Sequence, residues 1–226
     1  MKLDLLALSE SLRSALVSSR NWANATEPEP SNSLRSSRFC SEVGKKMEHL
    51  VQATSAGGAK LRRRQISVPE SGPRVAGEWL LDIVWTQDCW PDSRMNKDLP
   101  GIPEKIYCAL ECESNTSSRA FFTDFSKLLH VLSPVKVFLG GLNQKTEKAT
   151  REYIALRLEQ VYKLAKSMET QDPTEWYVGF WPSPKKDGQT SMWDQLQSFP
   201  HLDRTYLYYM SDNGFHEVVA LGQEKP

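Results

Sequence analysis

The sequence predicts an α/β protein in which a central mixed β-sheet is flanked by α-helices. Two observations support this fold class. Helical and strand-like segments follow one another along the chain as helix, strands, helix, strand, helix and strands. The chain of 226 residues, 39% hydrophobic with 7 Trp, 7 Tyr and 8 Phe, can also bury one sizeable core, and a disordered chain would hold fewer aromatics.

The N-terminal region is expected to hold two helices. Leucines recur near helical spacing in the first segment, with Ser, Arg and Glu between them. We therefore expect an amphipathic helix in residues 1–23, and the acids within its apolar part argue against a signal peptide. Residues 24–34 are rich in Pro, Ser and Asn, which predicts a linker. A second helix is expected over 35–53, within a folded domain that covers 35–226.

The rest of the chain alternates between strands and helices. Apolar runs bounded by turn residues predict strands at 78–85, 105–113, 135–142 and 175–181. Apolar stripes at helical spacing predict helices at 117–132 and 144–168. The turn residues Ser211-Asp212-Asn213-Gly214, between two apolar runs, predict a β-hairpin.

Cysteine usage and hydropathy indicate a cytoplasmic protein without a membrane partner. None of Cys40, Cys89, Cys108 and Cys112 belongs to a CxxC pair, so buried thiols are favoured over a zinc site or a disulfide. Thiols of this kind are typical of a reducing compartment. No apolar run approaches the length that crosses a bilayer.

Charge is balanced overall but uneven along the chain. The 28 basic and 28 acidic residues give a net charge of zero, which by itself does not support nucleic-acid binding. Residues 30–75 nevertheless hold nine basic residues against three acidic ones, an excess of six positive charges. Within this region we expect Arg62, Arg63 and Arg64 to contact a phosphate backbone, the alternative being an exposed loop.

Three carboxylates interrupt strands that are otherwise apolar. Because side chains alternate across a strand, Glu111 and Glu113 project together from one face at the end of 105–113, and Asp82 interrupts the strand expected at 78–85. Acids in such strands are costly unless they are paired or bound to a metal, and a divalent cation removes their mutual repulsion. The alternative is that Glu111 and Glu113 leave the sheet into solvent while Asp82 pairs with an arginine.

A strand Asp, about thirty further residues, a strand that ends in Glu-x-Glu and then a helix resemble the core motif of the PD-(D/E)xK, or restriction endonuclease-like, nucleases. Here Asp82 and Glu111-Cys112-Glu113 supply the motif, and Glu113 stands where the family usually has Lys, which is similar to the BamHI-like Glu-x-Glu branch. The following residues match that branch in spacing to within one residue: Asn115, Ser117, Ser118 and Lys127-Leu128-Leu129. The resemblance covers roughly residues 78–140.

The resemblance implies a role for each of these residues. Asp82 and Glu111, with the main-chain carbonyl of Cys112, would hold Mg²⁺ or Mn²⁺, and Glu113 would bind the metal or orient the attacking water. The sequence departs from the family in having no Pro before Asp82 and no Lys in the motif. Lys127, on the following helix, is the candidate for the missing positive charge, the alternative being a solvated helix lysine.

Two further groups of residues are candidates through the same resemblance. Such families often carry an acid on an upstream helix, and Glu42 and Glu48 are available here, with a surface role as the alternative for each. Ser117, Ser118 and Arg119 lie near the N-terminus of the helix that follows the Glu-x-Glu motif, where they are candidates for phosphate contacts.

The function implied is that of a Mg²⁺-dependent, type II restriction endonuclease-like enzyme acting on double-stranded DNA, and cleavage of both strands would favour a homodimer. The first alternative is a catalytically inactive nuclease-fold module that binds DNA or a protein partner; the neutral net charge and the missing Lys favour it slightly. The second is a hydrolase of sugars with paired carboxylates. That reading fits less well because Glu111 and Glu113 are close neighbours on one strand and do not face each other across a cleft.

Overall fold

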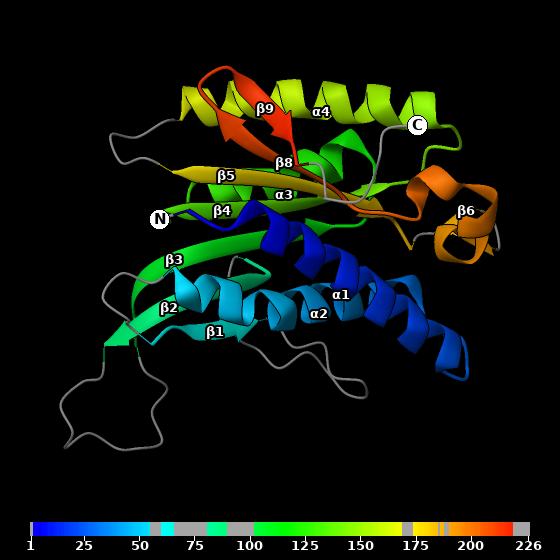
Figure 1. Ribbon diagram of the computed structural model, residues 1–226, viewed down its shortest axis with the longest axis horizontal. Helices are drawn as coiled ribbons and strands as arrows, with labels where there is room; N and C mark the ends of the chain where they lie inside the picture. Colours follow the sequence, from blue (N-terminus) through cyan, green and yellow to red (C-terminus); the bar gives the residue numbers. More distant parts are fainter. Residues whose placement is uncertain are drawn as a thin grey trace.

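The computed structural model describes residues 2–54, 60–65, 81–89, 102–168, 174–184, 186–187 and 190–218. Its centre is a seven-stranded mixed sheet with the strand order β1-β2-β3-β4-β5-β8-β9. Helices cover both faces of this sheet (Figure 1). The predicted α/β class with a central mixed sheet is therefore confirmed, at the level of the general architecture.

Four helices begin at residues whose side chains cap the first turn. Asp4, Ser31, Ser117 and Thr146 each accept a hydrogen bond from a main-chain N–H of the helix that follows, which satisfies a donor that the helix itself leaves unpaired. The helices are α1 (Leu5–Ala25), α2 (Asn32–Ala53), α3 (Ser118–Leu129) and α4 (Glu147–Ser167).

The strands of the main sheet are β1 (Arg62–Gln65), β2 (Ile83–Cys89), β3 (Ile102–Glu113), β4 (Val135–Leu142), β5 (Glu175–Pro182), β8 (Tyr206–Ser211) and β9 (Gly214–Glu217). β3, β4 and β5 run parallel to one another, and the other neighbours pair antiparallel. A small separate sheet joins β6 (Lys186–Asp187) to β7 (Thr190–Ser191), and the 3₁₀ helices η2 (Met192–Ser198) and η3 (Pro200–Leu202) follow it.

Each face of the sheet has its own apolar core. On one face α1 and α2 bury residues such as Leu12 and Phe39, and the Phe39 ring stacks on Trp181 of β5 at 4.0 Å between centroids. On the other face α3 and α4 bury residues such as Phe121 and Ile154. The alternation of side chains along β3 therefore sends consecutive residues to different helical layers.

Two glycines of β4 allow close packing around the end of β3. A Cβ atom on Gly140 would lie 2.8 Å from the Phe121 ring of α3, and one on Gly141 would lie 2.5 Å from the Ser114 carbonyl oxygen. Both distances are shorter than real Cβ contacts. β4 therefore allows α3 to approach closely on one face of the sheet. On the other face it allows Ser114, the residue after β3, to do the same.

The structure differs from the expected boundaries in several places. α1 ends at Ala25 and α2 begins at Asn32, so fewer residues connect them than the expected 24–34. β2 begins at Ile83, directly after Asp82, while residues 78–80 lie outside the described part of the chain. β1 was not predicted, because three arginines and a glutamine show no apolar alternation.

The predicted C-terminal hairpin is confirmed. β8 and β9 pair antiparallel up to Ser211 and Gly214, so that Asp212 and Asn213 form the two-residue loop. Gly214 has φ +123°, a conformation that other residues rarely adopt.

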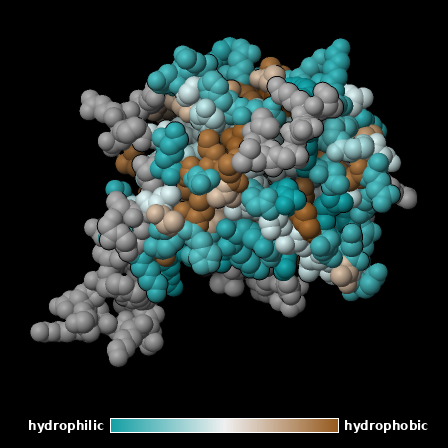
Figure 2. All heavy atoms as spheres, viewed as in Figure 1, coloured by the Kyte–Doolittle hydropathy of each residue, from teal (hydrophilic) through white to brown (hydrophobic). Residues whose placement is uncertain are grey.

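Among the described helices, none combines the length and apolar character needed to cross a membrane. Figure 2 shows hydrophilic residues over most of one face, with smaller hydrophobic patches between them. Leu6 and Val17 of α1 are among the large apolar side chains exposed to solvent.

The glycine contact at Ser114 leads to a stability prediction. We expect Gly141→Ala to lower the free energy of unfolding by about 1–3 kcal/mol, because the new methyl group meets a main-chain oxygen that also accepts a hydrogen bond from Ser183. Gly179→Ala is the control, since its nearest neighbour is the flexible end of Leu139, and we expect a smaller loss. Urea denaturation of both variants measures the difference, and equal losses would contradict the assigned contact.

Candidate active site

The register between β2 and β3 brings two of the predicted acids together. Ile83 pairs with Leu110, which places Asp82 beside Glu111. The main-chain N–H of Asp82 donates to Glu111 Oε1 at 3.2 Å, and the main-chain N–H of Cys112 donates to Asp82 Oδ2 at 2.9 Å. Just before β2 begins, the two segments are thus joined by hydrogen bonds from main-chain N–H groups to side-chain carboxylates. Asp82 and Glu111 therefore lie on adjoining segments of the chain.

The lysine predicted on the following helix also reaches this position. Lys127 Nζ of α3 lies 3.4 Å from Glu111 Oε2 and 2.6 Å from Asp124 Oδ1. The Glu111 side chain is only 1% exposed, whereas that of Lys127 is 30% exposed. Lys127 is therefore a partly exposed helix lysine that contacts two carboxylates.

Glu113 and Asp124 form the outer part of the cluster. Glu113 accepts a hydrogen bond from the main-chain N–H of Asn115, and its side chain also forms a hydrogen bond with Asp124. Two carboxyl groups can share a hydrogen bond only if one of them is protonated. Asp124 was missed in the sequence, although it lies three residues before Lys127 and therefore on the same side of α3. We call Asp82, Glu111, Glu113, Asp124 and Lys127 the acidic centre.

Burial and mutual repulsion make the acidic centre hold protons. Burial, followed by the charge of Asp82, raises the pKa of Glu111 to about 9. Burial and then the hydrogen bond with Asp124 raise the pKa of Glu113 to about 7, and burial raises the pKa of Asp82 as well. Partial burial lowers the pKa of Lys127, but its hydrogen bond with Asp124 and the charge of Glu111 raise it overall. One ammonium group therefore faces four carboxyl groups.

The donor set of the acidic centre fits a hard divalent cation in part. Among the described residues, no group of three or more His, Cys, Asp or Glu side chains is arranged to hold a metal. However, Asp82 and Glu111 present adjacent carboxylate oxygens, the ligand type that Mg²⁺ prefers. Mg²⁺ usually keeps several waters and needs only one or two protein carboxylates. A bound cation would also offset the repulsion that raises the pKa of Glu111.

The residues predicted at the start of α3 lie there, but two of them already have partners within the protein. Ser117 is the N-cap and accepts from the main-chain N–H of Ala120. The Ser118 hydroxyl accepts from Arg157 at 2.8 Å. Arg119 is exposed. The helix N-terminus is therefore formed as expected, with Arg119 as its exposed cation.

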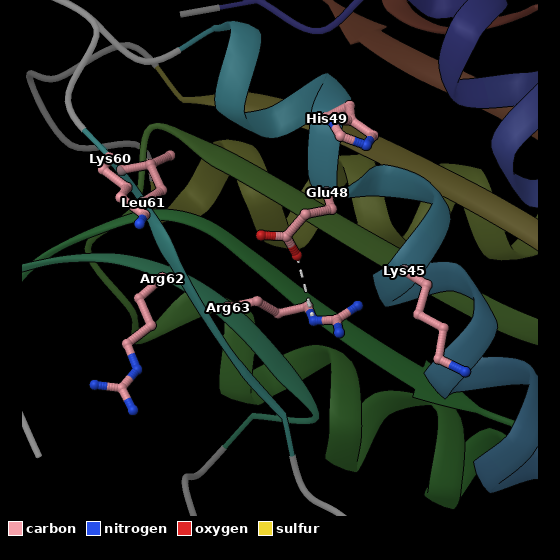
Figure 3. A pocket seen from close by; sticks show the side chains of 7 residues that line it. All are labelled: Lys45, Glu48, His49, Lys60, Leu61, Arg62 and Arg63. Carbon is pink, nitrogen blue, oxygen red and sulfur yellow. Dashed lines mark ion pairs between the residues drawn. The ribbon is translucent and has the colours of Figure 1, made fainter.

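The three arginines that we expected to contact a phosphate backbone have different surroundings in the structure. They belong to the edge strand β1, so the alternative of an exposed loop is wrong. Arg63 Nε lies 3.3 Å from Glu48 of α2 (Figure 3), and Arg64 Nε donates to the Thr86 hydroxyl at 3.3 Å. Arg62 is exposed and lines a surface pocket.

The two upstream acids form ion pairs away from the acidic centre. Glu42 contacts Arg38 at 3.1 Å and Lys45 at 2.9 Å, and Glu48 pairs with Arg63. The surface alternative holds for Glu48, which is partly exposed, whereas Glu42 is buried. The ion pairs therefore place both residues with basic side chains of α2 and β1.

The cysteines are free thiols where the structure describes them. Cys108 is buried, whereas Cys40 and Cys112 are partly buried. The side chain of Cys89 lies outside the described residues.

Comparison with protein-family models, with curated proteins and with solved structures finds no match. The acidic centre combines a nearly inaccessible carboxyl group, a second carboxylate hydrogen-bonded to the end of the same strand, and a lysine from the next helix.

The raised pKa of Glu111 predicts how stability depends on pH. Folding raises this pKa from 4.5 to about 9, so the folded protein keeps a proton that the unfolded chain has released across that interval. We therefore expect the free energy of unfolding of the metal-free protein to fall as pH rises from 5 to about 9. Glu111→Gln, which stays neutral, should flatten this fall.

Urea denaturation at several pH values with a chelator present measures the effect. Glu159→Gln is the control, because Glu159 is a solvent-exposed glutamate of α4 paired with Lys163. If the Glu111→Gln variant and the wild-type protein show the same pH dependence, Glu111 does not hold the proton.

Proposed function

We propose that this protein is a Mg²⁺- or Mn²⁺-dependent endonuclease that hydrolyses phosphodiester bonds of double-stranded DNA, in the manner of type II restriction endonucleases. The observation that supports the proposal most strongly is the contact between Glu111 and Lys127. The motif resembles a nuclease motif but has Glu113 where a lysine is usual. The helix that follows supplies a lysine at 3.4 Å from the motif's first glutamate.

Asp82 and Glu111 are the residues that would hold the cation, with the Cys112 carbonyl as a third oxygen ligand. A divalent cation at this point would polarise a phosphoryl oxygen and lower the pKa of a bound water. The N–H groups of Asp82 and Cys112 fix the orientation of both carboxylates, so their oxygens are positioned before a ligand binds.

Glu113 and Lys127 supply the remaining functions of the reaction. A carboxylate with a pKa of about 7 is partly ionised near neutral pH, so Glu113 can accept a proton from the attacking water. Lys127 stays protonated and faces the centre, where its charge stabilises the negative charge that develops on the phosphoryl oxygens. A homodimer would bring two such centres to the two strands of a duplex.

A catalytically inactive module that binds DNA or a protein partner is the second candidate. It is favoured by the lack, among the described side chains, of a preformed group of three metal ligands. A hydrogen bond between Glu113 and Asp124 in place of a cation is also consistent with it. Cleavage of supercoiled plasmid with Mg²⁺ or Mn²⁺, compared with the same reaction in EDTA, separates the two candidates.

Removal of either metal-holding carboxylate should stop cleavage. We expect Asp82→Asn and Glu111→Gln each to lower the cleavage rate at least about 100-fold, because each loses one ligand charge. Divalent metal should raise the melting temperature of the wild-type protein and barely change that of either variant. The metal assignment is wrong if Glu111→Gln responds to Mg²⁺ and Mn²⁺ as the wild-type protein does.

A charge exchange tests whether Lys127 takes the place of the usual lysine. We expect Lys127→Gln to lower cleavage by about 10- to 100-fold, and the double variant Glu113→Lys/Lys127→Gln to regain part of that loss. The exposed Lys163→Gln on α4 is the matched control and should cleave at the wild-type rate. A double variant no more active than Lys127→Gln would show that the two positions are not interchangeable.

A further inference from the structure

The solvent side of α1 carries a stripe of two apolar and two charged residues. Leu6, Glu10, Arg13 and Val17 follow one another at intervals of four, three and four residues, so they lie along one side of the helix. All four are exposed, Leu6 to 45% and Val17 to 46%. The other side of α1 packs on the sheet beside α2 (Figure 1), where residues such as Leu12 are buried. We call the four exposed residues the α1 stripe.

The two charges of the α1 stripe are paired within one helix. Arg13 donates from Nε and Nη2 to the two carboxylate oxygens of Glu10, at 2.9 and 2.8 Å. This contact does not use the Nη1 group of Arg13, and each carboxylate oxygen can accept a second hydrogen bond. An ion pair as exposed as this one adds little to the stability of a single chain. Both side chains therefore keep groups with which a second protein surface can bond.

The α1 stripe is complementary to itself. When two copies of a helix pack antiparallel about a twofold axis, residues at equal distances before and after the axis face each other. With the axis midway between Glu10 and Arg13, Glu10 faces Arg13 of the partner subunit. The same axis brings Leu6 opposite Val17 of the partner subunit. Apolar residues thus meet apolar residues, and charges meet their opposites. The spacing of four, three and four is also that of the residues at which two coiled-coil helices meet.

α4 shows that exposed leucines alone do not give this match. It carries the exposed ion pair of Glu159 with Lys163, and Leu156 is exposed on the same helix. An antiparallel contact that brings Glu159 opposite Lys163 of the partner subunit also brings Leu156 opposite Lys166 of the partner subunit, so that an apolar residue meets a charge. Single exposed apolar residues are common on protein surfaces. The agreement between apolar and charged positions therefore distinguishes α1.

We propose that the α1 stripe is the contact surface of a symmetric homodimer, in which α1 packs antiparallel on α1 of a second copy of the chain. A second copy is the partner that the pattern favours, because self-pairing uses the same four residues on both sides. One helix per copy buries less than the roughly 1,200–2,000 Å² of a stable complex, so we expect a weak dimer, formed at about 100 µM protein.

The inference does not rest on the nuclease function. α1 packs on the face of the sheet opposite to α3, the helix that supplies Lys127 to the acidic centre. The proposed contact therefore neither includes the acidic centre nor covers it.

Charge reversal followed by mixing tests the contact. Analytical ultracentrifugation measures the self-association of the wild-type chain, Glu10→Arg and Arg13→Glu. Each reversal brings like charges together at both ends of the charged layer, so we expect each variant to associate at least about tenfold more weakly. In an equal mixture, the two arginines of one variant face the two glutamates of the other, and we expect a heterodimer of about wild-type affinity. Glu159→Arg on α4 is the matched control and should associate as the wild-type protein does.

Three results overturn the proposal. The first is a wild-type protein that stays monomeric at the expected concentration. The second is a wild-type dimer that both reversals leave unchanged, since the chain then associates through another surface. The third is association that is lost in each variant and not regained in the mixture, because damage to α1 has that effect without any contact between the charges. No DNA is present in these measurements, so their failure leaves the nuclease function untouched, and a dimer that never cleaves refutes only that function.

Discussion

The arrangement of the centre depends on the burial of one carboxyl group, that of Glu111. A carboxyl group with almost no access to water must be protonated, hydrogen-bonded or paired with a cation. Here the N–H of Asp82, the residue before β2, and the ammonium group of Lys127 of α3 each contact one of its two oxygens. A shift in strand register or in the position of α3 would leave this group without one partner. The two contacts of Glu111 therefore fix the relative placement of β2, β3 and α3.

Much of the centre could be predicted from sequence because it depends on local geometry. Alternation along β3 is a property of the backbone, so it placed Glu111 and Glu113 on one face without knowledge of their neighbours. Asp124 could not be found in this way, since its contact with Glu113 arises only when α3 packs on the sheet. The edge strand β1 was missed for a related reason: its arginines have no apolar pattern, and their opposite orientations follow from pairing with Trp85 and Val84.

α2 has an apolar side and a charged side. On the side toward the sheet it contributes apolar residues such as Val43 and Met47 to the core. Elsewhere on the helix, its acids Glu42 and Glu48 are taken up by lysine and arginine side chains. The net charge of zero thus conceals an uneven distribution, in which the acidic centre holds four carboxyl groups and one ammonium group.

Gly140 allows α3 to pack close to β4, next to the acidic centre. It pairs with Glu113 across the parallel strands, and the space that its missing side chain leaves is filled by the ring of Phe121. Phe121 belongs to the same helix as Asp124 and Lys127, so the space left at Gly140 bears on where that helix packs against the sheet. The absence of a side chain at Gly140 thus contributes to the geometry of the acidic centre. A methyl group added there would change the electrostatics of the centre without adding or removing any charge.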